Sequence, residues 1–235
     1  MGLGIKTWIQ FILKETFGGG HGWFSAAGDY ETWQQNRIKS ILKHYSADFF
    51  DGKTIIELGA GYGDIGRFFH QLGAKVTFIE GRKENVTEIQ RRYPSMRVLQ
   101  WDLNDPLPPT ADKADIIIHF GLLYHLGNPE ASLRNSCRAC QYMMLETECC
   151  DSDDPNFVRP VKEKAYWKDH ALNGEGCSPS PAFVERTLTE EGMEFERVTD
   201  ARCNGGEHFY DWPIKNTGIT KKGQRKFWFV KKKAH

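Results

Sequence analysis

The sequence predicts a doubly wound α/β fold, in which helices cover both faces of a parallel sheet. Two observations predict it. From residue 54 onward, short apolar runs typical of strands alternate with segments of helical periodicity, the order that builds a parallel sheet. The first such unit is a strand, a glycine-rich turn and a helix over residues 54–72. With 235 residues, 40% hydrophobic and 26% charged, the chain has the size and composition of one globular domain.

The expected elements follow in chain order. The apolar run 8–13 predicts a short amphipathic helix that packs on the domain, and residues 30–45 predict a second helix with one apolar face. Ser180 and Pro181 are typical of a helix start, since serine caps the first turn and proline fits its first position. Strands are expected at 54–56, 75–80, 97–101, 115–119, 142–145, 194–198 and 226–230. Further helices are expected at 65–72, at 129–140 and at 181–192, and one more holds Val86 and Ile89 and ends before Pro94.

Charge and cysteine content exclude several classes of protein. Lys plus Arg and Asp plus Glu number 31 each, so no overall field favours nucleic acid or an anionic membrane as a partner. Cys137-x-x-Cys140 has no second pair to complete a zinc site, and we interpret the six cysteines as reduced thiols. The run 8–13 is too short for a membrane span and lacks a cleavage site after it. We therefore expect a cytoplasmic protein without a membrane span.

A glycine-rich turn follows the first expected strand. Gly59, Gly61 and Gly63 alternate there, which lets the backbone turn sharply and lets a ligand approach the helix N-terminus. The same stretch contains G-x-G-x-x-G at Gly61, Gly63 and Gly66, a pattern that nicotinamide and flavin enzymes share. The turn therefore predicts a nucleotide-like cofactor without identifying it.

Acidic residues lie at the ends of the first three strands. Glu57 comes two residues before the first glycine, where a carboxylate favours a cationic ligand such as a sulfonium. Glu80 ends the second strand, where a carboxylate can accept both hydroxyls of a ribose. Asp102 follows the third strand and is placed to accept from an adenine amino group. Each acid alone fits a surface group, a helix cap or a turn, but three at successive strand ends indicate a nucleoside site.

These motifs resemble those of the class I S-adenosylmethionine-dependent methyltransferases over residues 53–230. The resemblance rests on Ile56-Glu57-Leu58-Gly59-Ala60-Gly61-Tyr62-Gly63, on Glu80 and Asp102, and on the segment His119 to Leu126. It implies a Rossmann-like sheet of seven strands with an antiparallel last strand. The motif style is closer to small-molecule and glycan methyltransferases than to nucleic-acid enzymes. The cofactor contacts that it implies are Glu57, Gly59, Ala60, Gly61, Gly63, Glu80, Gly81, Asp102, Leu103 and Phe120.

The N-terminal part of the chain precedes the first strand. In the methyltransferases that the chain resembles, such segments often cover the cofactor. Residues 1–50 are therefore expected to form a helical lid, and residues 51–235 the methyltransferase domain. The glycine-rich stretch 18–22, followed by Trp23 and Phe24, is interpreted as the hinge of this lid or, alternatively, as a linker with two packing aromatic residues.

Three residues are candidates for the acid–base chemistry of methyl transfer. His125 follows the fourth strand at the carboxyl edge of the sheet, where ligands bind, and is predicted to be the base. The alternative is a histidine that packs or hydrogen-bonds beside the cofactor. His208 and Asp211 are rival candidates in the connection 199–225, which we interpret as a flap over the site. His119, inside the fourth strand, is expected to be a core residue with satisfied hydrogen bonds.

Other patterns leave alternatives open. Phe209 and Trp212 of the flap either hold a sugar ring or pack within the flap itself. A group of acids after the fifth strand could bind metal or acceptor hydroxyls, but acidic runs are usually solvated loops, so a divalent metal is not favoured. A basic group near the C-terminus suits phosphates, but at zero net charge we interpret it as lysines that protect an edge strand. The acids are Glu146, Glu148, Asp151, Asp153 and Asp154, and the basic group comprises Lys221, Lys222, Arg225, Lys226 and residues 231–233.

The sequence therefore predicts an S-adenosylmethionine-dependent methyltransferase that acts on a hydroxyl of a sugar, a glycan end or a related small molecule. Three alternatives stay open. They are an RNA-modifying methyltransferase that uses the basic tail, a nicotinamide-dependent oxidoreductase, which Glu57 disfavours, and a non-catalytic subunit with the cofactor fold. The sequence identifies neither the methylated atom nor the oligomeric state.

Overall fold

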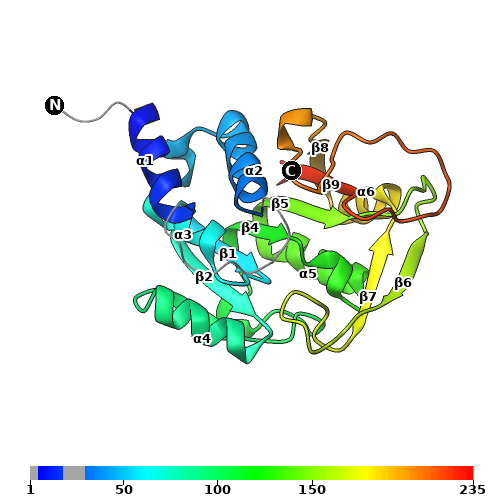
Figure 1. Cartoon of the computed structure of the whole chain (residues 1–235), viewed down its shortest axis with the longest axis horizontal. Helices are drawn as coiled ribbons and strands as arrows, with labels where there is room; N and C mark the ends of the chain where they lie inside the picture. The colour runs from blue at the N-terminus through cyan, green and yellow to red at the C-terminus, as the bar shows by residue number, and fades with distance from the viewer. Residues whose placement is uncertain (1–4, 18–29, 235) are drawn as a thin grey trace.

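The computed structural model describes residues 5–17 and 30–234 of the chain (Figure 1). A seven-stranded sheet forms its centre. Across the sheet the strands lie in the order β3 (Arg97–Gln100), β2 (Lys75–Glu80), β1 (Thr54–Leu58), β4 (Ala114–Phe120), β5 (Cys140–Glu148), β9 (Arg225–Lys232) and β8 (Met193–Arg197).

Strand direction follows the predicted pattern. The five strands from β3 to β5 pair in parallel, which their helical connections require. β9 pairs antiparallel with both β5 and β8. The predicted seven-stranded, mostly parallel sheet with an antiparallel last strand is therefore confirmed.

The last strand lies inside the sheet and not at its edge. β8 covers the side of β9 that faces away from β5, so the prediction that its lysines protect an exposed edge was wrong. Lys226 of β9 is buried, and its Nζ donates to the backbone oxygens of Tyr210 and Trp212 at 3.1 and 2.6 Å. This basic side chain therefore anchors the flap to the sheet.

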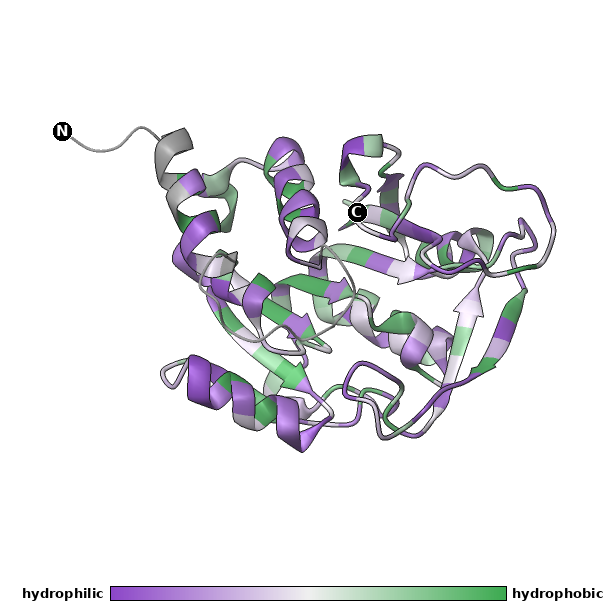
Figure 2. Cartoon of the chain, in the orientation of Figure 1, coloured by the Kyte–Doolittle hydropathy of each residue, from purple (hydrophilic) through white to green (hydrophobic). Residues whose placement is uncertain are grey.

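Helices cover both faces of the sheet, as predicted. Alternate strand residues supply two cores, because successive side chains of a strand point to opposite faces. Ile116 and Ile118 belong to one core, and Ile117 belongs to the other. Figure 2 shows the hydrophobic residues gathered on the strands and on the inward sides of the helices. The first face carries α1 (Ile5–Phe17), α2 (Tyr30–His44), α3 (Asp64–Gln71) and α4 (Lys83–Arg92), and the second carries α5 (Pro129–Ala139) and α6 (Pro181–Glu190).

The helices of the second face begin at side-chain caps. Ser180 Oγ accepts from the Phe183 amide at 2.9 Å, and Pro181 takes the first helical position, so the predicted start of α6 is confirmed. Asn128 Oδ1 caps α5 in the same way through the Ala131 amide at 3.1 Å. Each cap satisfies one of the amides that a first helical turn leaves unpaired.

A hairpin outside the main sheet follows β5. β6 (Val158–Lys162) and β7 (Glu175–Pro179) pair antiparallel as a separate two-stranded sheet. The sequence predicts only an acidic loop here, because Pro160 and Gly176 are rare in strands and apolar residues do not alternate with polar ones. Figure 1 shows the hairpin beside the carboxyl edge of the main sheet.

The N-terminal extension packs on the first face. α1 contacts α3, and Ile12 and Leu13 are buried in the core, so the predicted packing of the run 8–13 is confirmed. The glycine stretch 18–22, with Trp23 and Phe24, lies outside the described residues. Within residues 5–17 and 30–234, no helix has the length and apolar content needed to cross a membrane.

Candidate functional site

A pocket of about 710 Å³ opens at the carboxyl ends of the parallel strands. Ligands of open α/β sheets bind at this edge, and the volume is within the range of ligand sites, about 300–1,000 Å³. α2, the β6–β7 hairpin with its connection, and the flap 199–225 form its walls. Eleven of the predicted site residues line it, namely Glu57, Gly59, Ala60, Gly61, Glu80, Gly81, Asp102, Leu103, Phe120, His125 and His208.

The glycine-rich turn brings backbone close to the pocket. Gly59 and Gly61 have φ values of 64° and 58°, in the region that favours glycine. A Cβ on Gly59 would lie 3.0 Å from Leu122 Cδ1, so a side chain there would press on the turn after β4. Gly63, a predicted cofactor contact, does not line the pocket. It is the N-cap of α3 and faces the Phe78 ring, because the chain has already turned away into the helix.

Glu57 is a buried carboxyl in β1. Its Oε2 accepts a hydrogen bond from the Gly66 amide at 2.8 Å. Burial raises the pKa of Glu57 to about 8, with the Gly66 hydrogen bond opposing the shift and Asp64 adding to it. Such a group is largely protonated at neutral pH and ionises when a positive charge approaches, so this position suits a cationic ligand.

Glu80 and Asp102 line the pocket beside Glu57. Glu80 accepts from the amides of Gly61 and Arg82, each at 2.9 Å, and burial raises its pKa. Asp102 Oδ1 accepts from the Asn104 amide at 3.0 Å. Burial acts to raise the pKa of Asp102, but its hydrogen bonds lower that pKa overall. The three predicted strand-end acids therefore meet in one pocket.

His125 lies in the short turn η3 (Leu123–His125) and carries a carboxylate partner. Its Nδ1 is 2.8 Å from Glu163 Oε2 and 2.9 Å from Oε1. Burial lowers the pKa of His125, and Glu163 opposes that shift. The ring is therefore neutral near pH 7, and donation from Nδ1 to Glu163 leaves Nε2 as an acceptor. This geometry is that of an oriented general base.

Glu163 was not among the predicted residues. It directly follows β6, and its Oε2 also accepts from the Ala171 amide at 2.8 Å. Burial acts to raise the pKa of Glu163, but its hydrogen bond with His125 lowers that pKa overall. No sequence signal indicated it, because the hairpin itself was not predicted and 37 other positions separate it from His125 in the chain.

The two rival base candidates of the flap differ in position. His208 lines the pocket and stacks on Trp33, with ring centroids 3.9 Å apart. Burial lowers the pKa of His208 to about 4, so it is a weak base at neutral pH. Asp211 does not line the pocket; it is exposed and accepts from Asn204 Nδ2 at 2.9 Å. The structure thus places Asp211 outside the lining of the predicted catalytic site, because it is exposed between the buried Tyr210 and Trp212.

A buried charge cluster closes the base of the pocket. Glu146 Oε2 lies 3.2 Å from Arg37 NH1, and its Oε1 lies 3.0 Å from Arg225 NH1. Burial acts to raise the pKa of Glu146, but the two arginines lower it overall. Arg225 NH2 donates to Tyr124 OH at 2.8 Å. Arg37 and Arg225 both line the pocket, although Arg225 was grouped with the basic residues near the C-terminus and Arg37 had no signal in the sequence.

The acids that were predicted after the fifth strand have separate structural partners, and Glu146 and Glu148 lie within β5. Besides the paired Glu146, Asp151 accepts from the amides of Lys215 and Asn216 at 2.5 and 3.2 Å, which ties the flap to the end of β5. Glu148 lines the pocket, and burial raises its pKa. Within the part of the chain that the structure describes, no three His, Cys, Asp or Glu side chains are grouped to hold a metal ion.

His119 is a core residue of β4, as expected, but its hydrogen bonds differ from the prediction. It is fully buried, and neither ring nitrogen has a hydrogen-bond partner among the described residues. Burial lowers its pKa to about 4. In the sheet, His119 is paired with Leu58 of β1 and Leu145 of β5, neither of which offers a side-chain hydrogen-bond partner.

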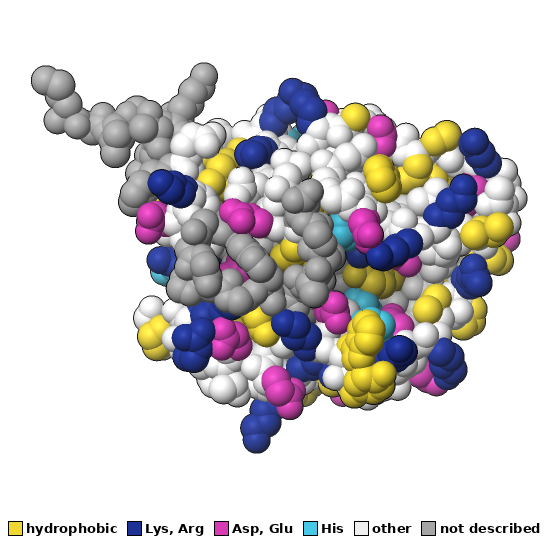
Figure 3. Space-filling model, in the orientation of Figure 1, with side chains coloured by type: hydrophobic (Ala, Val, Ile, Leu, Met, Phe, Trp, Pro, Cys, Tyr) yellow, Lys and Arg dark blue, Asp and Glu magenta, His cyan; other side chains and the backbone are white. Residues whose placement is uncertain are grey.

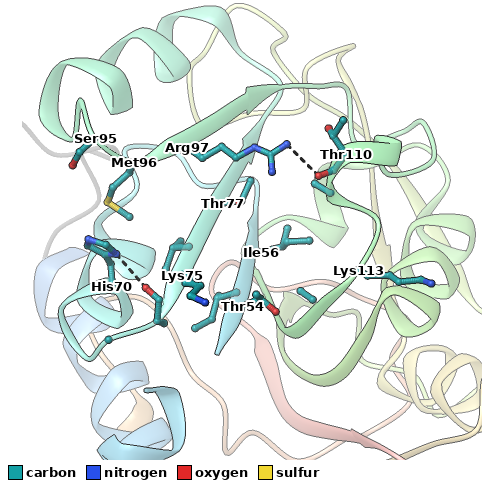
Figure 4. Close-up of a pocket in the computed structure, with 16 residues that line it drawn as sticks. Thr54, Ile56, His70, Lys75, Thr77, Ser95, Met96, Arg97, Thr110 and Lys113 are labelled. Carbon is teal, nitrogen blue, oxygen red and sulfur yellow. Dashed lines mark hydrogen bonds between the residues drawn. The ribbon is translucent and has the colours of Figure 1, made fainter. Parts of the chain in front are cut away.

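A second hollow, of about 580 Å³, lies at the amino ends of the strands. Figure 4 shows Lys75 and Thr54 at this edge, with Arg97 donating to the Thr110 oxygen at 3.1 Å. None of the predicted site residues lines this hollow. It is therefore a different feature from the pocket that holds Glu80 and His125.

Fold and pocket together define a class of protein. A glycine-rich turn after β1, acids at three strand ends and an antiparallel strand within a seven-stranded sheet are the architecture of class I methyltransferases. The methyltransferase-domain model matches residues 30–198. The chain therefore belongs to this methyltransferase family, and the predicted class is confirmed.

Known relatives agree with this assignment. The chain is 23% identical over 228 residues to phosphoethanolamine N-methyltransferase 1 of Arabidopsis thaliana, covering 83% of this chain and 45% of that protein. It thus spans about half the length of this curated relative.

Solved structures share the fold. The N-terminal domain of EvdMO1, crystallised with SAH and D-fucose, is similar with a TM-score of 0.66 and 20% identity, covering 99% of this chain and 98% of that one. Magnesium protoporphyrin IX methyltransferase from Synechocystis PCC 6803, with bound SAM, gives a TM-score of 0.59 and 15% identity, covering 99% of each chain. Similarity at this level of identity shows a common fold.

Proposed function

We propose that the chain is an S-adenosylmethionine-dependent O-methyltransferase that acts on a hydroxyl of a sugar or a related small molecule, with His125 as the base. The His125–Glu163 pair carries this proposal, because it lines the same pocket as the three strand-end acids. A hydroxyl loses its proton when it is methylated, so a neutral imidazole that lines the pocket is the group that this reaction needs.

The pocket residues fit S-adenosylmethionine. The buried carboxyl of Glu57 gains by ionising beside a positive charge, Glu80 suits ribose hydroxyls, and Asp102 suits the adenine amino group. When bound, this cofactor supplies a methyl group on a positively charged sulfur, whose bond to sulfur breaks as the bond to the acceptor forms. The ligands in the EvdMO1 and Synechocystis structures, SAH and SAM, support this choice.

The residues of the chain then handle the acceptor's proton. His125 Nε2 takes the proton from the hydroxyl, and the ionised Glu163 stabilises the imidazolium that forms. The proton passes to solvent when the imidazolium returns to its neutral state. Glu163 thus acts by orienting and stabilising His125.

The acceptor end of the pocket combines rings and polar groups. Trp33, Tyr124 and His208 supply rings, and Glu148 supplies a carboxyl. Apolar faces and hydrogen-bonding groups in one cavity suit a polyol, whose ring has both kinds of surface. D-fucose in the EvdMO1 domain crystal supports a sugar acceptor.

A phosphorylated acceptor, as in the name of the Arabidopsis relative, fits this pocket less well. A phosphate needs cations that can turn toward it. Arg37 and Arg225 share Glu146, and Lys222 pairs with Glu207. Arg82 donates to two backbone oxygens, at 2.8 and 3.1 Å, and Lys168 Nζ donates to Tyr62 OH at 3.2 Å.

The remaining alternatives are also less favoured. Membership of the methyltransferase family excludes the nicotinamide oxidoreductase. An RNA-modifying enzyme would use the basic group near the C-terminus, but Arg225 and Lys226 of that group are buried. A non-catalytic subunit would not need the His125–Glu163 pair.

The N-terminal extension is proposed to cover the site. Tyr30, Trp33, Gln34 and Arg37 of α2 line the pocket, which supports the lid interpretation of residues 1–50. Gln34 and Arg37 are buried there. Movement of α2 would therefore change access to the pocket.

Methylation of an acceptor panel tests the proposal. Purified protein is given S-adenosylmethionine with D-fucose, D-glucose or phosphoethanolamine, and release of S-adenosylhomocysteine is measured. We expect turnover with a sugar, and His125→Ala should lower kcat by about a hundredfold or more while cofactor affinity stays within about twofold. His70→Ala, an exposed histidine at the opposite edge of the sheet, is the matched control. Full activity of His125→Ala, or methyl transfer only to the amine of phosphoethanolamine, would contradict the proposal.

A further inference from the structure

Trp167 is a large aromatic residue that stays exposed at the pocket. Its side chain is 46% exposed and lines the pocket, whereas the neighbouring Tyr166 is 76% exposed and does not. Figure 3 shows hydrophobic side chains grouped next to histidines on this face of the molecule. Water contact with an indole is unfavourable, and a ligand ring that covers it removes that contact. Apolar surface exposed beside a polar cavity is typical of a binding site.

The segment that carries Trp167 is tied down along its length. We call residues 163–173, between β6 and β7, the strap. Arg82 NH2 donates to the backbone oxygens of His170 and Ala171 in the strap, at 2.8 and 3.1 Å. Asn173 Nδ2 donates to Asp102 Oδ2 at 3.1 Å. These bonds attach the strap to the loops after β2 and β3, so the indole is held in place before any ligand arrives.

Short turns inside the strap fix Trp167 itself. The Trp167 amide donates to the Lys164 oxygen at 2.9 Å, and the His170 amide donates to the Trp167 oxygen at 3.2 Å. Lys164 Nζ lies 4.7 Å from the centre of the indole ring. Lys164 itself does not line the pocket, so its ammonium group supports the indole without facing the cavity.

A continuous row of side chains joins the indole of Trp167 to the imidazole of His125. The Trp167 and His170 rings meet edge to face, with centroids 4.9 Å apart. His170 Nδ1 lies 3.6 Å from Glu163 Oε2, and Glu163 holds His125 at 2.8 Å. A molecule that rests on the indole therefore lies along the wall that ends at His125.

We propose that Trp167 is a specificity-determining residue of the methyltransferase, on whose indole face the ring of a carbohydrate acceptor stacks while a hydroxyl of that ring reaches His125. The inference rests on the proposed function and adds the residue that selects its acceptor. A pyranose ring has an apolar face for the indole and peripheral hydroxyls for the imidazole of His125, and both side chains line the pocket. A protein partner is less well matched, because the indole belongs to a concave pocket and a protein interface needs a much larger surface.

Three variants test the role of Trp167. Trp167→Ala removes the stacking surface, Trp167→Phe keeps a smaller ring, and Tyr166→Ala is the matched control because Tyr166 does not line the pocket. Steady-state kinetics with D-fucose and D-glucose give kcat and KM for each. Saturation-transfer NMR of D-fucose with S-adenosylhomocysteine present measures acceptor binding without turnover, and calorimetry measures cofactor affinity.

We expect Trp167→Ala to raise KM for the sugar about tenfold, the factor that corresponds to 1.4 kcal/mol. Cofactor affinity should stay within about twofold, Trp167→Phe should recover most of the loss, and Tyr166→Ala should match the unchanged protein. Unchanged KM and NMR signals in Trp167→Ala would overturn the inference and leave the proposed function intact. If the unchanged protein neither binds nor methylates a sugar but methylates phosphoethanolamine, both the inference and the proposed acceptor class fall.

Discussion

Replacing Glu163 with Gln removes one charge from the pair that holds His125 and keeps the size of the side chain. The carboxylate lies 2.8 Å from His125 Nδ1, the distance of a charge-assisted hydrogen bond. Such bonds contribute about 1.5–3 kcal/mol, roughly twice a neutral one. The variant should therefore lose about 1–2 kcal/mol of stabilisation of the imidazolium, which lowers kcat by about five- to thirtyfold. The kcat value falls further if the new amide donates to Nδ1, because the ring then carries its proton on Nε2. Nε2 can then no longer accept the proton of the acceptor hydroxyl.

The pH dependence of kcat gives a second test of the same variant. The neutral form of His125 is the active one, so the rate rises as pH increases through its pKa. Glu163 raises the pKa of His125 against the lowering effect of burial. Without the carboxylate that pKa falls further, and the acidic limb of the profile moves to lower pH.

The assay measures S-adenosylhomocysteine release from pH 5 to 9 with the sugar that serves as the best acceptor. Glu175→Gln is the matched control, since Glu175 lies at the exposed end of the same hairpin and pairs with Lys162. A kcat within twofold of the unchanged protein, with an unmoved acidic limb, would refute the assignment of His125 and Glu163 as one catalytic unit.

Two other substitutions test the cofactor acids and the core. Glu80→Ala should weaken S-adenosylmethionine binding by about 1–3 kcal/mol in calorimetry, the scale of a lost hydrogen bond to a charged group. Unchanged affinity would contradict the assignment of Glu80 to the ribose. The control is Asp211→Ala, at an exposed position. His119→Phe tests the buried ring whose folded-state pKa is about 4, below the ordinary value of 6.5. Because the unfolded chain binds more protons than the folded chain between these values, stability due to His119 is lost as pH falls through that window. From pH 7 to pH 5 the unchanged protein should lose about 2 kcal/mol more than the variant in urea unfolding, and equal losses would contradict a shifted His119.

The sheet and the predicted cofactor residues of the pocket were predictable from sequence because their signals are local. Glu57, Gly59 and Gly61 lie within one strand and its turn, and the topology of a parallel sheet alone brings Glu80 and Asp102 to the same edge. Gly63 has the same local signal and yet lies outside the pocket lining, because the spacing does not specify which glycine becomes the N-cap of α3.

The buried charge cluster of the pocket was less predictable because its residues meet only through tertiary packing. Arg37, Glu146 and Arg225 come from α2, β5 and β9, and the sequence around each of them gave no sign that they pair. Pairing is what allows such charges to be buried, and no pattern along one segment reports it. The edge assigned to β9 was wrong for the same reason, since the position of β8 beside it depends on the order of the whole sheet.

The strap joins the two ends of the pocket, and this determines how the substitutions must be measured. Through Asn173 it contacts Asp102, and through Glu163 it holds His125. A substitution that loosened the strap would therefore weaken cofactor binding and slow proton transfer together. One that removes only the carboxylate of Glu163 or the indole of Trp167 should change kcat or the acceptor KM while cofactor affinity stays constant. Measuring the three quantities separately distinguishes a residue that acts on the acceptor from one that only supports the fold.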